Sequence, residues 1–353
     1  MTKLPNDMVM MSATRRDLLR MAASAGLLAT VPTALAGVAF AQDKPLVALV
    51  HTQAAGDSGP IDDMIRHLDK LAGEIPMQTR KIYAQDPATF EEIFRNLGEA
   101  KAAVVITTFY AVAEPLKAVA PAYPGTKFIH LYSDPIDPPI PNVQTVNYDE
   151  YLASYLSGLY GARVSKTKKL GYIAGASVPS LNANFNALKA AAQSIDPAIT
   201  VTPAFVGSFQ DPAKAREIAL QMYQSGIDYI QTDAAGSNPG IVQAANEGAG
   251  RVVTGTAIET AVMGPKTMQA SIILGFGLSL YNQTKAALEG KFVAGHYNAN
   301  MKDGVIDFRQ SDIFLAQGDG AAIEQAKAVW PEIEKAKGGI IDGSLTVPFV
   351  TTI

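Results

Sequence analysis

The chain of 353 residues contains no cysteine, and this absence excludes several kinds of site. It can form no disulfide, no thiolate metal site and no cysteine-linked lipid anchor of the kind that bacterial lipoproteins carry. Hydrophobic residues make up 48% of the chain and charged residues 18%. We therefore expect a fold that is held together by its own hydrophobic core.

Patterns that indicate catalysis are absent as well. The four histidines show no i,i+4 spacing, so a metal site is not expected. The chain contains neither the Gly-x-Ser-x-Gly motif of a nucleophile elbow nor a Gly-x-x-x-x-Gly-Lys-Ser/Thr phosphate loop. Gly275-Phe-Gly277 is too short for a dinucleotide fingerprint. We expect no catalytic residues and no cofactor, and an enzyme on an α/β frame is the weaker alternative.

An excess of positive charge is also missing. The 29 basic and 33 acidic residues give a formal net charge of −4. No run of basic residues indicates a nucleic-acid partner, and only the N-terminal segment is a long apolar run. We expect a freely soluble protein that binds neither nucleic acid nor a membrane.

The N-terminal segment has the form of an export signal. Thr14-Arg-Arg-Asp-Leu-Leu-Arg20 resembles a twin-arginine signal, and about twenty small and apolar residues follow it. Ala39-Phe40-Ala41 has the A-x-A form of a cleavage site. A membrane-spanning helix is the alternative, but Pro32 interrupts the run and polar sequence begins at Gln42. We expect cleavage near Ala41 and a mature protein in the periplasm.

Beyond residue 44, short β-branched runs alternate with longer segments of helical period. This alternation predicts parallel sheets that are covered by helices on both faces. Four prolines between Asp134 and Pro141 interrupt it, after which the pattern begins again. Asp211-Pro212 has the composition of a helix N-cap followed by the first turn. The expected strands are 46–51, 79–83, 103–107, 127–132, 169–174, 199–206, 228–231 and 251–255, with helices between them.

Two α/β units without a catalytic cluster are typical of a hinged binding protein. In a parallel sheet the ligand lies beyond the carboxyl ends of the strands, so two such sheets can enclose one cleft between them. Closure of the two units would bury the ligand on all sides. A sensing module that presents its closed state to a membrane receptor has the same construction, and this alternative stays open.

Several segments resemble the basic-membrane-protein family, whose members are periplasmic substrate-binding proteins of ABC importers. The resemblance covers roughly residues 45–310 and is most specific at Phe205-Val-Gly-Ser-Phe-Gln-Asp-Pro-Ala-Lys214. Further matches are Lys169–Pro179, Asp196-Pro197, Gly226–Asp233 and Ala287–Lys291. It implies the periplasmic binding protein type I fold, with two doubly wound lobes joined by a hinge. It also implies an ABC permease with its ATPase as partners.

The same resemblance implies the lobe boundaries and the ligand residues. Lobe 1 would comprise residues 44–145 and about 258–300, and lobe 2 residues 146–257 and about 301–353. The best-known family members bind purine nucleosides, stacking the base between aromatic side chains and holding the ribose with an acidic residue. The positions of this chain that match such contacts are Asp57, Phe109, Tyr110, Asn186, Phe209 and Asp233.

Two positions depart from the family pattern. Ala257 stands where relatives carry the acidic ribose ligand, and Leu274 lies in the apolar stretch that replaces a charged position. An unmet polar partner of this kind costs about 1–3 kcal/mol, which disfavours a nucleoside. Glu259 is a candidate to replace the missing acid. A free purine base and an aromatic or heterocyclic acid both remain open as ligands.

Overall fold

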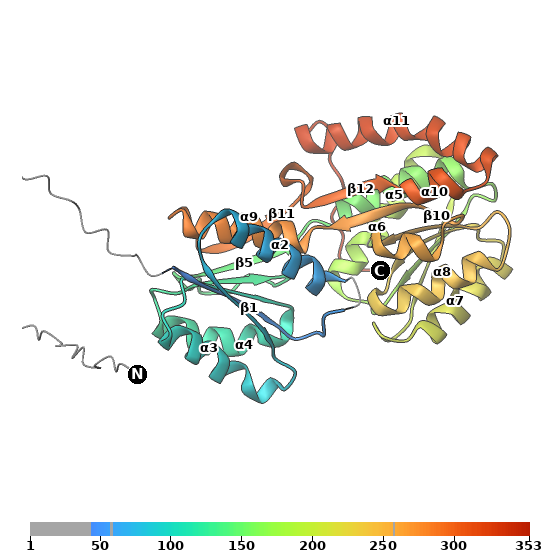
Figure 1. Cartoon of the computed structure of the whole chain (residues 1–353). Coiled ribbons are helices and arrows are strands. Elements are labelled where there is room, and N and C mark those ends of the chain that lie inside the picture. Colours follow the sequence, from blue (N-terminus) through green and yellow to red (C-terminus); the bar gives the residue numbers. More distant parts are fainter. Residues whose placement is uncertain (1–43, 57–58, 257) are drawn as a thin grey trace, which may run out of the picture. The chain divides into compact units, whose positions relative to one another are not determined.

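The computed structural model describes residues 44–56, 59–256 and 258–353, without the side chains of residues 258–260. The predicted export signal lies outside these residues. The described strands form two six-stranded sheets, each with its own helices (Figure 1). The two sheets have the same strand order, because in each the first strand of the sequence lies between the second and the third. This is the doubly wound arrangement that the alternating sequence predicts.

All neighbouring strands of the first sheet are parallel. Its strands, in spatial order, are β11 (Gly295–Ala299), β5 (Val143–Tyr148), β4 (Lys127–Leu131), β3 (Val104–Thr108), β1 (Leu46–His51) and β2 (Gln78–Tyr83). The helices α2 (Pro60–Glu74) and α9 (Phe276–Leu288) pack together against one face. The helices α3 (Phe90–Glu99) and α4 (Ala113–Val119) cover the other face.

The second sheet is parallel except for one edge strand, which runs antiparallel to its neighbour. Its strands, in spatial order, are β12 (Ile306–Gln310), β10 (Met268–Leu274), β9 (Val252–Thr256), β8 (Tyr229–Asp233), β6 (Lys169–Ala174) and β7 (Thr200–Phe205). Its helices are α5 (Tyr151–Val164), α6 (Pro179–Ile195), α7 (Pro212–Gln224), α8 (Asn238–Asn246), α10 (Asp312–Gln317) and α11 (Gly320–Asp342). The predicted cap of α7 is confirmed, because Asp211 accepts a hydrogen bond from the Lys214 amide.

The chain passes between the two sheets three times. It leaves the first sheet after Tyr148, returns between Leu274 and Phe276, and leaves again between Ala299 and Ile306. The predicted boundaries at 146 and 258 are therefore corrected to about 149 and 275. The reason is that β10 pairs with β9, the strand before it in the sequence, and so belongs to the second sheet. A buried apolar strand such as β10 does not reveal by its composition which sheet it joins.

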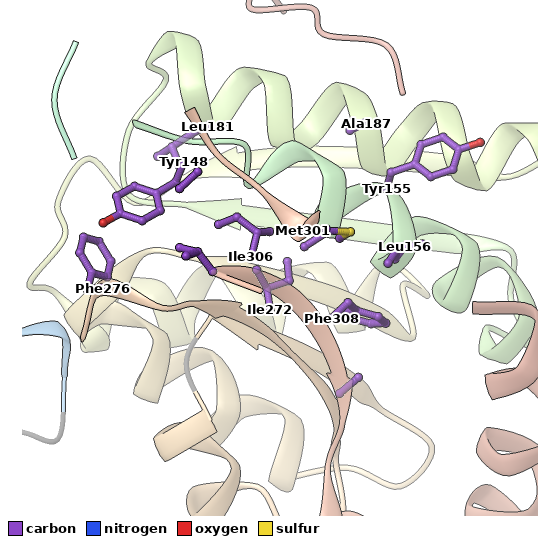
Figure 2. Packing of buried hydrophobic residues seen from close by; sticks show 14 of the residues in the cluster. Tyr148, Tyr155, Leu156, Leu181, Ala187, Ile272, Phe276, Met301, Ile306 and Phe308 are labelled. Atoms are coloured by element: carbon purple, nitrogen blue, oxygen red, sulfur yellow. The ribbon is translucent and has the colours of Figure 1, made fainter. Parts of the chain in front are cut away.

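Side chains from both halves of the chain share one hydrophobic core at these crossings. Figure 2 shows Tyr148, which ends β5, beside Phe276, which begins α9. Met301 and Ile306, from the third crossing, are buried in the same cluster. The crossings are therefore embedded in apolar packing.

Candidate ligand site

An aromatic cluster lies at the carboxyl ends of three neighbouring strands of the first sheet. Phe109 follows β3, Tyr132 follows β4, and Tyr148 ends β5. The ring of Phe276 is centred 4.8 Å from Tyr148, 5.9 Å from Tyr132 and 6.0 Å from Phe109. Tyr110 lies at its edge, 5.7 Å from Tyr132, with 46% of its surface exposed. We call these five residues the aromatic cluster. Tyr148 and Phe276 are buried in the core, and the partly accessible Phe109, Tyr110 and Tyr132 offer a surface for a flat ligand.

Two members of the aromatic cluster have an unusual backbone. The φ angles of Phe109 and Tyr132 are +69° and +55°, in the left-handed region that costs a residue other than glycine about 1–3 kcal/mol. Buried His130 helps to hold this geometry, because its Nε2 donates to the carbonyl of Phe109 at 2.8 Å. Burial lowers the pKa of His130 to about 4, so its ring is neutral at pH 7. Strained residues of this kind gather at ligand sites.

The second sheet presents a group of buried polar side chains. Asp233, the last residue of β8, is 7% exposed. Its Oδ2 accepts hydrogen bonds from the Tyr172 hydroxyl at 2.7 Å and from the Asn184 amide at 2.8 Å. Glu150, which directly precedes α5, is 5% exposed. We call Glu150, Tyr172, Asn184 and Asp233 the acidic cluster.

The two carboxyls of the acidic cluster are difficult to ionise together. Burial raises the pKa of Asp233 to about 6, even though its two hydrogen-bond donors oppose this shift. Burial, followed by the charge of Asp233, raises the pKa of Glu150 well above its usual range. Burial therefore opposes ionisation of both carboxyls, and the anion of Asp233 is stabilised by its two donors.

Tyr132 brings the aromatic and acidic clusters together. Its side chain lies close to Ser180, near the start of α6. Burial raises the pKa of Tyr132 well above its usual range, and the charges of Glu150 and Asp233 raise it further. An aromatic surface from one sheet thus adjoins a polar, acidic surface from the other.

Phe209 lies at the same edge of the second sheet, in the loop after β7. Its ring rests on Gly175, the residue after β6, so closely that a Cβ at Gly175 would overlap it. Phe209 is nevertheless 42% exposed, so one side of the ring is open. This combination of a fixed ring and an open face suits contact with a ligand.

Four of the seven residues that were predicted from the sequence lie at or just after the carboxyl ends of strands, two in each sheet. They are Phe109, Tyr110, Phe209 and Asp233. Asn186 does not join them, because its amide donates to the carbonyls of Val350 and Thr352 near the chain terminus. Asp57 and the side chain of Glu259 lie outside the described residues.

The residues that the sequence analysis did not identify are Tyr132, Tyr148, Glu150, Tyr172, Asn184 and Phe276. The sequence analysis expected no strand at residues 143–148, so neither Tyr148 nor Glu150 stood beside a predicted strand end. Asn184 lies two positions before Asn186, so the two side chains leave α6 in nearly opposite directions. Motif matching selected Asn186, which points away from Asp233.

Two of the cavities among the described residues bear on the location of the site. One of about 330 Å³ adjoins the aromatic cluster at Phe276 and is lined by Gly59, Thr256 and Leu274 among others. The larger, about 700 Å³, lies around the starts of β9 and β10 and of α11. Because ligands of parallel sheets bind beyond the carboxyl ends of strands, the smaller cavity belongs to the candidate site and the larger does not.

Sequence comparison relates the chain to substrate-binding proteins of ABC transporters. The family model described as "ABC transporter substrate-binding protein PnrA-like" matches residues 63–337. The chain is 25% identical over 277 residues to a purine-binding protein of Brucella abortus, covering 77% of each chain. It is 27% identical over 256 residues to the ABC transporter nucleoside-binding protein BmpA of Lactococcus lactis, covering 68% of this chain and 69% of the relative.

Among solved structures, the chain resembles an ABC transporter solute-binding protein from Aeropyrum pernix. The TM-score is 0.70 at 19% sequence identity, covering 86% of this chain and 93% of that one. This likeness confirms the predicted periplasmic binding protein type I fold, with two doubly wound α/β units.

Proposed function

Because the chain belongs to the PnrA-like family of ABC transporter substrate-binding proteins, we propose that it captures a small flat heterocycle, with a free purine base as the favoured ligand. Proteins of this family bind small molecules and deliver them to a membrane permease. The observation that carries the proposal is the meeting of the aromatic cluster and the acidic cluster at Tyr132.

The two clusters have complementary tasks in this proposal. The aromatic cluster and Phe209 stack on the faces of the ring, and each such pair contributes about 0.5–1.5 kcal/mol beyond burial of its area. Asp233 and Asn184 hydrogen-bond to the polar edge of the ring. Closure of the two lobes removes water, which strengthens these hydrogen bonds.

A free base suits the site better than a nucleoside. Ala257 and Leu274 occupy the two positions at which the family resemblance implies polar contacts, and half-buried Leu274 lines the cavity beside Phe276. A ribose hydroxyl beside Leu274 would lack a polar partner, at a cost of about 1–3 kcal/mol for each unmet group. The Brucella relative is named for purine binding, which agrees with this preference.

The remaining parts of the proposal concern location and partners. Members of the family typically work outside the cytoplasm, and the segment at residues 14–41 is proposed to be a twin-arginine export signal that is cleaved near Ala41. An ABC permease with its ATPase receives the ligand, and the chain itself catalyses no reaction. No helix in the described ranges has the length and apolarity to cross a membrane.

The direct test is native mass spectrometry of the protein recovered from the periplasm, followed by denaturation to release any bound molecule. Titration calorimetry then compares adenine and hypoxanthine with adenosine and inosine. We expect the bases to bind at least about tenfold more tightly than the nucleosides, since one unmet hydroxyl is worth that much. Equal or tighter binding of the nucleosides would overturn the preference for a base.

A further inference from the structure

The larger of the two cavities, of about 700 Å³, lies at the amino ends of β9 and β10. The smaller cavity adjoins the carboxyl ends of the same two strands, so the length of the strands separates the two cavities. The volume of the larger cavity falls in the range of about 300–1,000 Å³ that is typical of sites for small organic ligands. The proposed function makes no use of this cavity.

The charged side chains around the larger cavity are mainly basic. Lys166, Arg251 and Lys266 line it, and within the described part of the chain none of the three forms an ion pair with a carboxylate. Of the two carboxylates in the lining, Glu247 already has an arginine partner and Asp319 caps α11. The described lining therefore holds three cations against one unpaired carboxylate, and a concave surface of this kind attracts anions.

Arg251 is held in place by contacts within the protein. Its Nη1 donates to the carbonyl of Ala244 at 2.6 Å, and its guanidinium lies 4.5 Å from the centre of the Tyr223 ring. The guanidinium also packs on Gly248, where a Cβ would overlap it. Its other N–H groups donate to no acceptor among the described residues. A fixed guanidinium with unused donors matches the oxygens of a phosphate group.

The loop of residues 247–251 adds backbone donors beside this guanidinium. The amides of Ala249, Gly250 and Arg251 form no hydrogen bond with a described residue. Gly250 has a φ angle of +74°, in the left-handed region that glycine adopts without strain. Successive amides in a turn of this kind form a concave site for an anion.

A buried side chain on the other face of the sheet has an unused donor as well. Gln269, at the start of β10, is 5% exposed and lines the cavity. Its Oε1 accepts from the Tyr160 hydroxyl at 2.6 Å, whereas its Nε2 donates to no described residue and remains accessible. Because the polar groups of buried side chains are normally satisfied, this donor suits an acceptor oxygen of a ligand.

The cavity reaches around the edge of the second sheet. Tyr160, the partner of Gln269, belongs to the hydrophobic core on the α5 side. Tyr223, which supports Arg251, belongs to the core on the α7 side. A ligand that contacts both Arg251 and Gln269 is therefore longer than a bare ion.

We infer that the larger cavity is a second binding site, which takes a small phosphorylated solute. Arg251 and the amides of the 247–251 loop hold the phosphate, and Gln269 donates to a hydroxyl on the rest of the molecule. A phosphate monoester carries a charge of about −1.5 to −2 at pH 7, which matches the excess of positive charge better than a single carboxylate does. This site does not depend on the proposed function of the other cavity.

Calorimetry of the mature protein at pH 7 tests the inference with ribitol 5-phosphate, ribitol and inorganic phosphate. We expect ribitol 5-phosphate to bind with a Kd below about 1 mM and at least about tenfold more tightly than inorganic phosphate, with no binding of ribitol. Absence of binding by the ester overturns the inference. Inorganic phosphate that binds as tightly as the ester overturns the assignment of an organic solute.

Adenine distinguishes the two cavities in the same experiment. The affinity for ribitol 5-phosphate should be unchanged in excess adenine, because no described residue lines both cavities. Displacement of the ester by adenine would place the phosphate in the candidate ligand site and overturn the inference. Binding of the ester to a protein that does not bind adenine would contradict the proposed function alone.

Single substitutions locate the phosphate. In Arg251→Gln and Gln269→Glu, we expect ribitol 5-phosphate to bind at least about tenfold more weakly, because a donor to the ligand is lost. Lys335→Gln removes one positive charge from an exposed position of α11 outside the cavity and is the matched control. Thermal melts establish that each variant is folded.

Lys266→Gln keeps the test open if the Arg251 variant does not fold. This exposed residue of the lining should contribute about threefold in affinity, as is usual for a charge at the surface. An equal loss in Lys335→Gln would indicate general attraction of anions and contradict a defined site. Unchanged affinity in the folded cavity variants contradicts the inference as well.

Discussion

Asp149 is a half-buried carboxyl at the first crossing between the two sheets. Burial, and to a lesser degree the charge of Asp303, raises its pKa to about 6. The folded state therefore holds a proton that the unfolded state has lost between about pH 4 and pH 6. The stabilisation that this proton provides is complete below pH 4 and disappears as the pH rises through 6.

We predict that Asp149→Asn increases the free energy of unfolding at pH 7 by about 1–2 kcal/mol, after allowance for partial exposure of the group. At pH 4 the variant and the parent should be equally stable. Urea unfolding at pH 4, 5, 6 and 7 measures the difference between the two proteins at each pH. A constant difference across this range would contradict the prediction.

Gly175 and Phe209 provide a second prediction at the residue scale. A Cβ at Gly175 would displace the Phe209 ring, which lies in a loop and is already 42% exposed. We expect Gly175→Ala to weaken adenine binding by about tenfold through loss of one stacking contact, with little change in melting temperature. Calorimetry and a thermal melt measure these two effects, and Gly125→Ala, where a Cβ meets no neighbour, is the control. Unchanged affinity would show that Phe209 does not contact the ligand.

The residues of the candidate site were only partly predictable. Phe109, Phe209 and Asp233 end strands or follow them, and local sequence is enough to place them at the carboxyl edges. Glu150 and Tyr132 gain their importance from contacts between segments that are distant in the sequence. Distant contacts also account for Asn186, whose side chain binds the carbonyls of Val350 and Thr352 near the end of the chain.

At the scale of elements, the terminal segment is held against α6. Asn182 donates to the carbonyl of Thr351, Asn186 to those of Val350 and Thr352, and Tyr151 packs on Phe349 at 4.9 Å. We predict that Asn186→Ala lowers the free energy of unfolding by about 1 kcal/mol and leaves adenine affinity unchanged. Asn96→Ala, on an exposed position of α3, is the control. Weakened binding without loss of stability would return Asn186 to the ligand site.

The contact between α5 and α6 depends on Gly158. A Cβ there would overlap the backbone carbonyl of Leu188, which cannot move independently of α6. We predict that Gly158→Ala destabilises the protein by about 1–3 kcal/mol. Gly73→Ala, at an exposed position of α2 where a Cβ has free space, should instead stabilise the protein by about 0.5–1 kcal/mol. Denaturant unfolding of both variants measures whether the two substitutions change the free energy of unfolding in opposite directions.

The sequence predicts most elements because their signals are local. Asp211-Pro212 begins α7, and the buried stripe of Phe90, Phe94 and Leu97 defines α3. The predicted lobe boundary near residue 258 was wrong. Which of the two similar sheets β10 joins depends on its pairing with β9. Pairing between strands is a property of the whole fold, which local composition does not contain.

At the scale of the whole molecule, the shared core at the crossings couples the two halves. Tyr148, Phe276, Met301 and Ile306 belong to one buried cluster that contains residues of both sheets. We predict a single cooperative unfolding transition in scanning calorimetry, with equal calorimetric and van't Hoff enthalpies. Two resolved transitions would show that each lobe unfolds independently.

The pairing of β11 with β5 has a consequence for biosynthesis. His296 is aligned with Thr145, a residue 151 positions earlier, and β11 is the strand that covers the outer side of β5. A nascent chain that ends before β11 therefore exposes the backbone donors and acceptors of β5, an edge at which other chains can add. Such a fragment should self-associate, whereas adding a synthetic peptide of residues 293–301 should suppress that association.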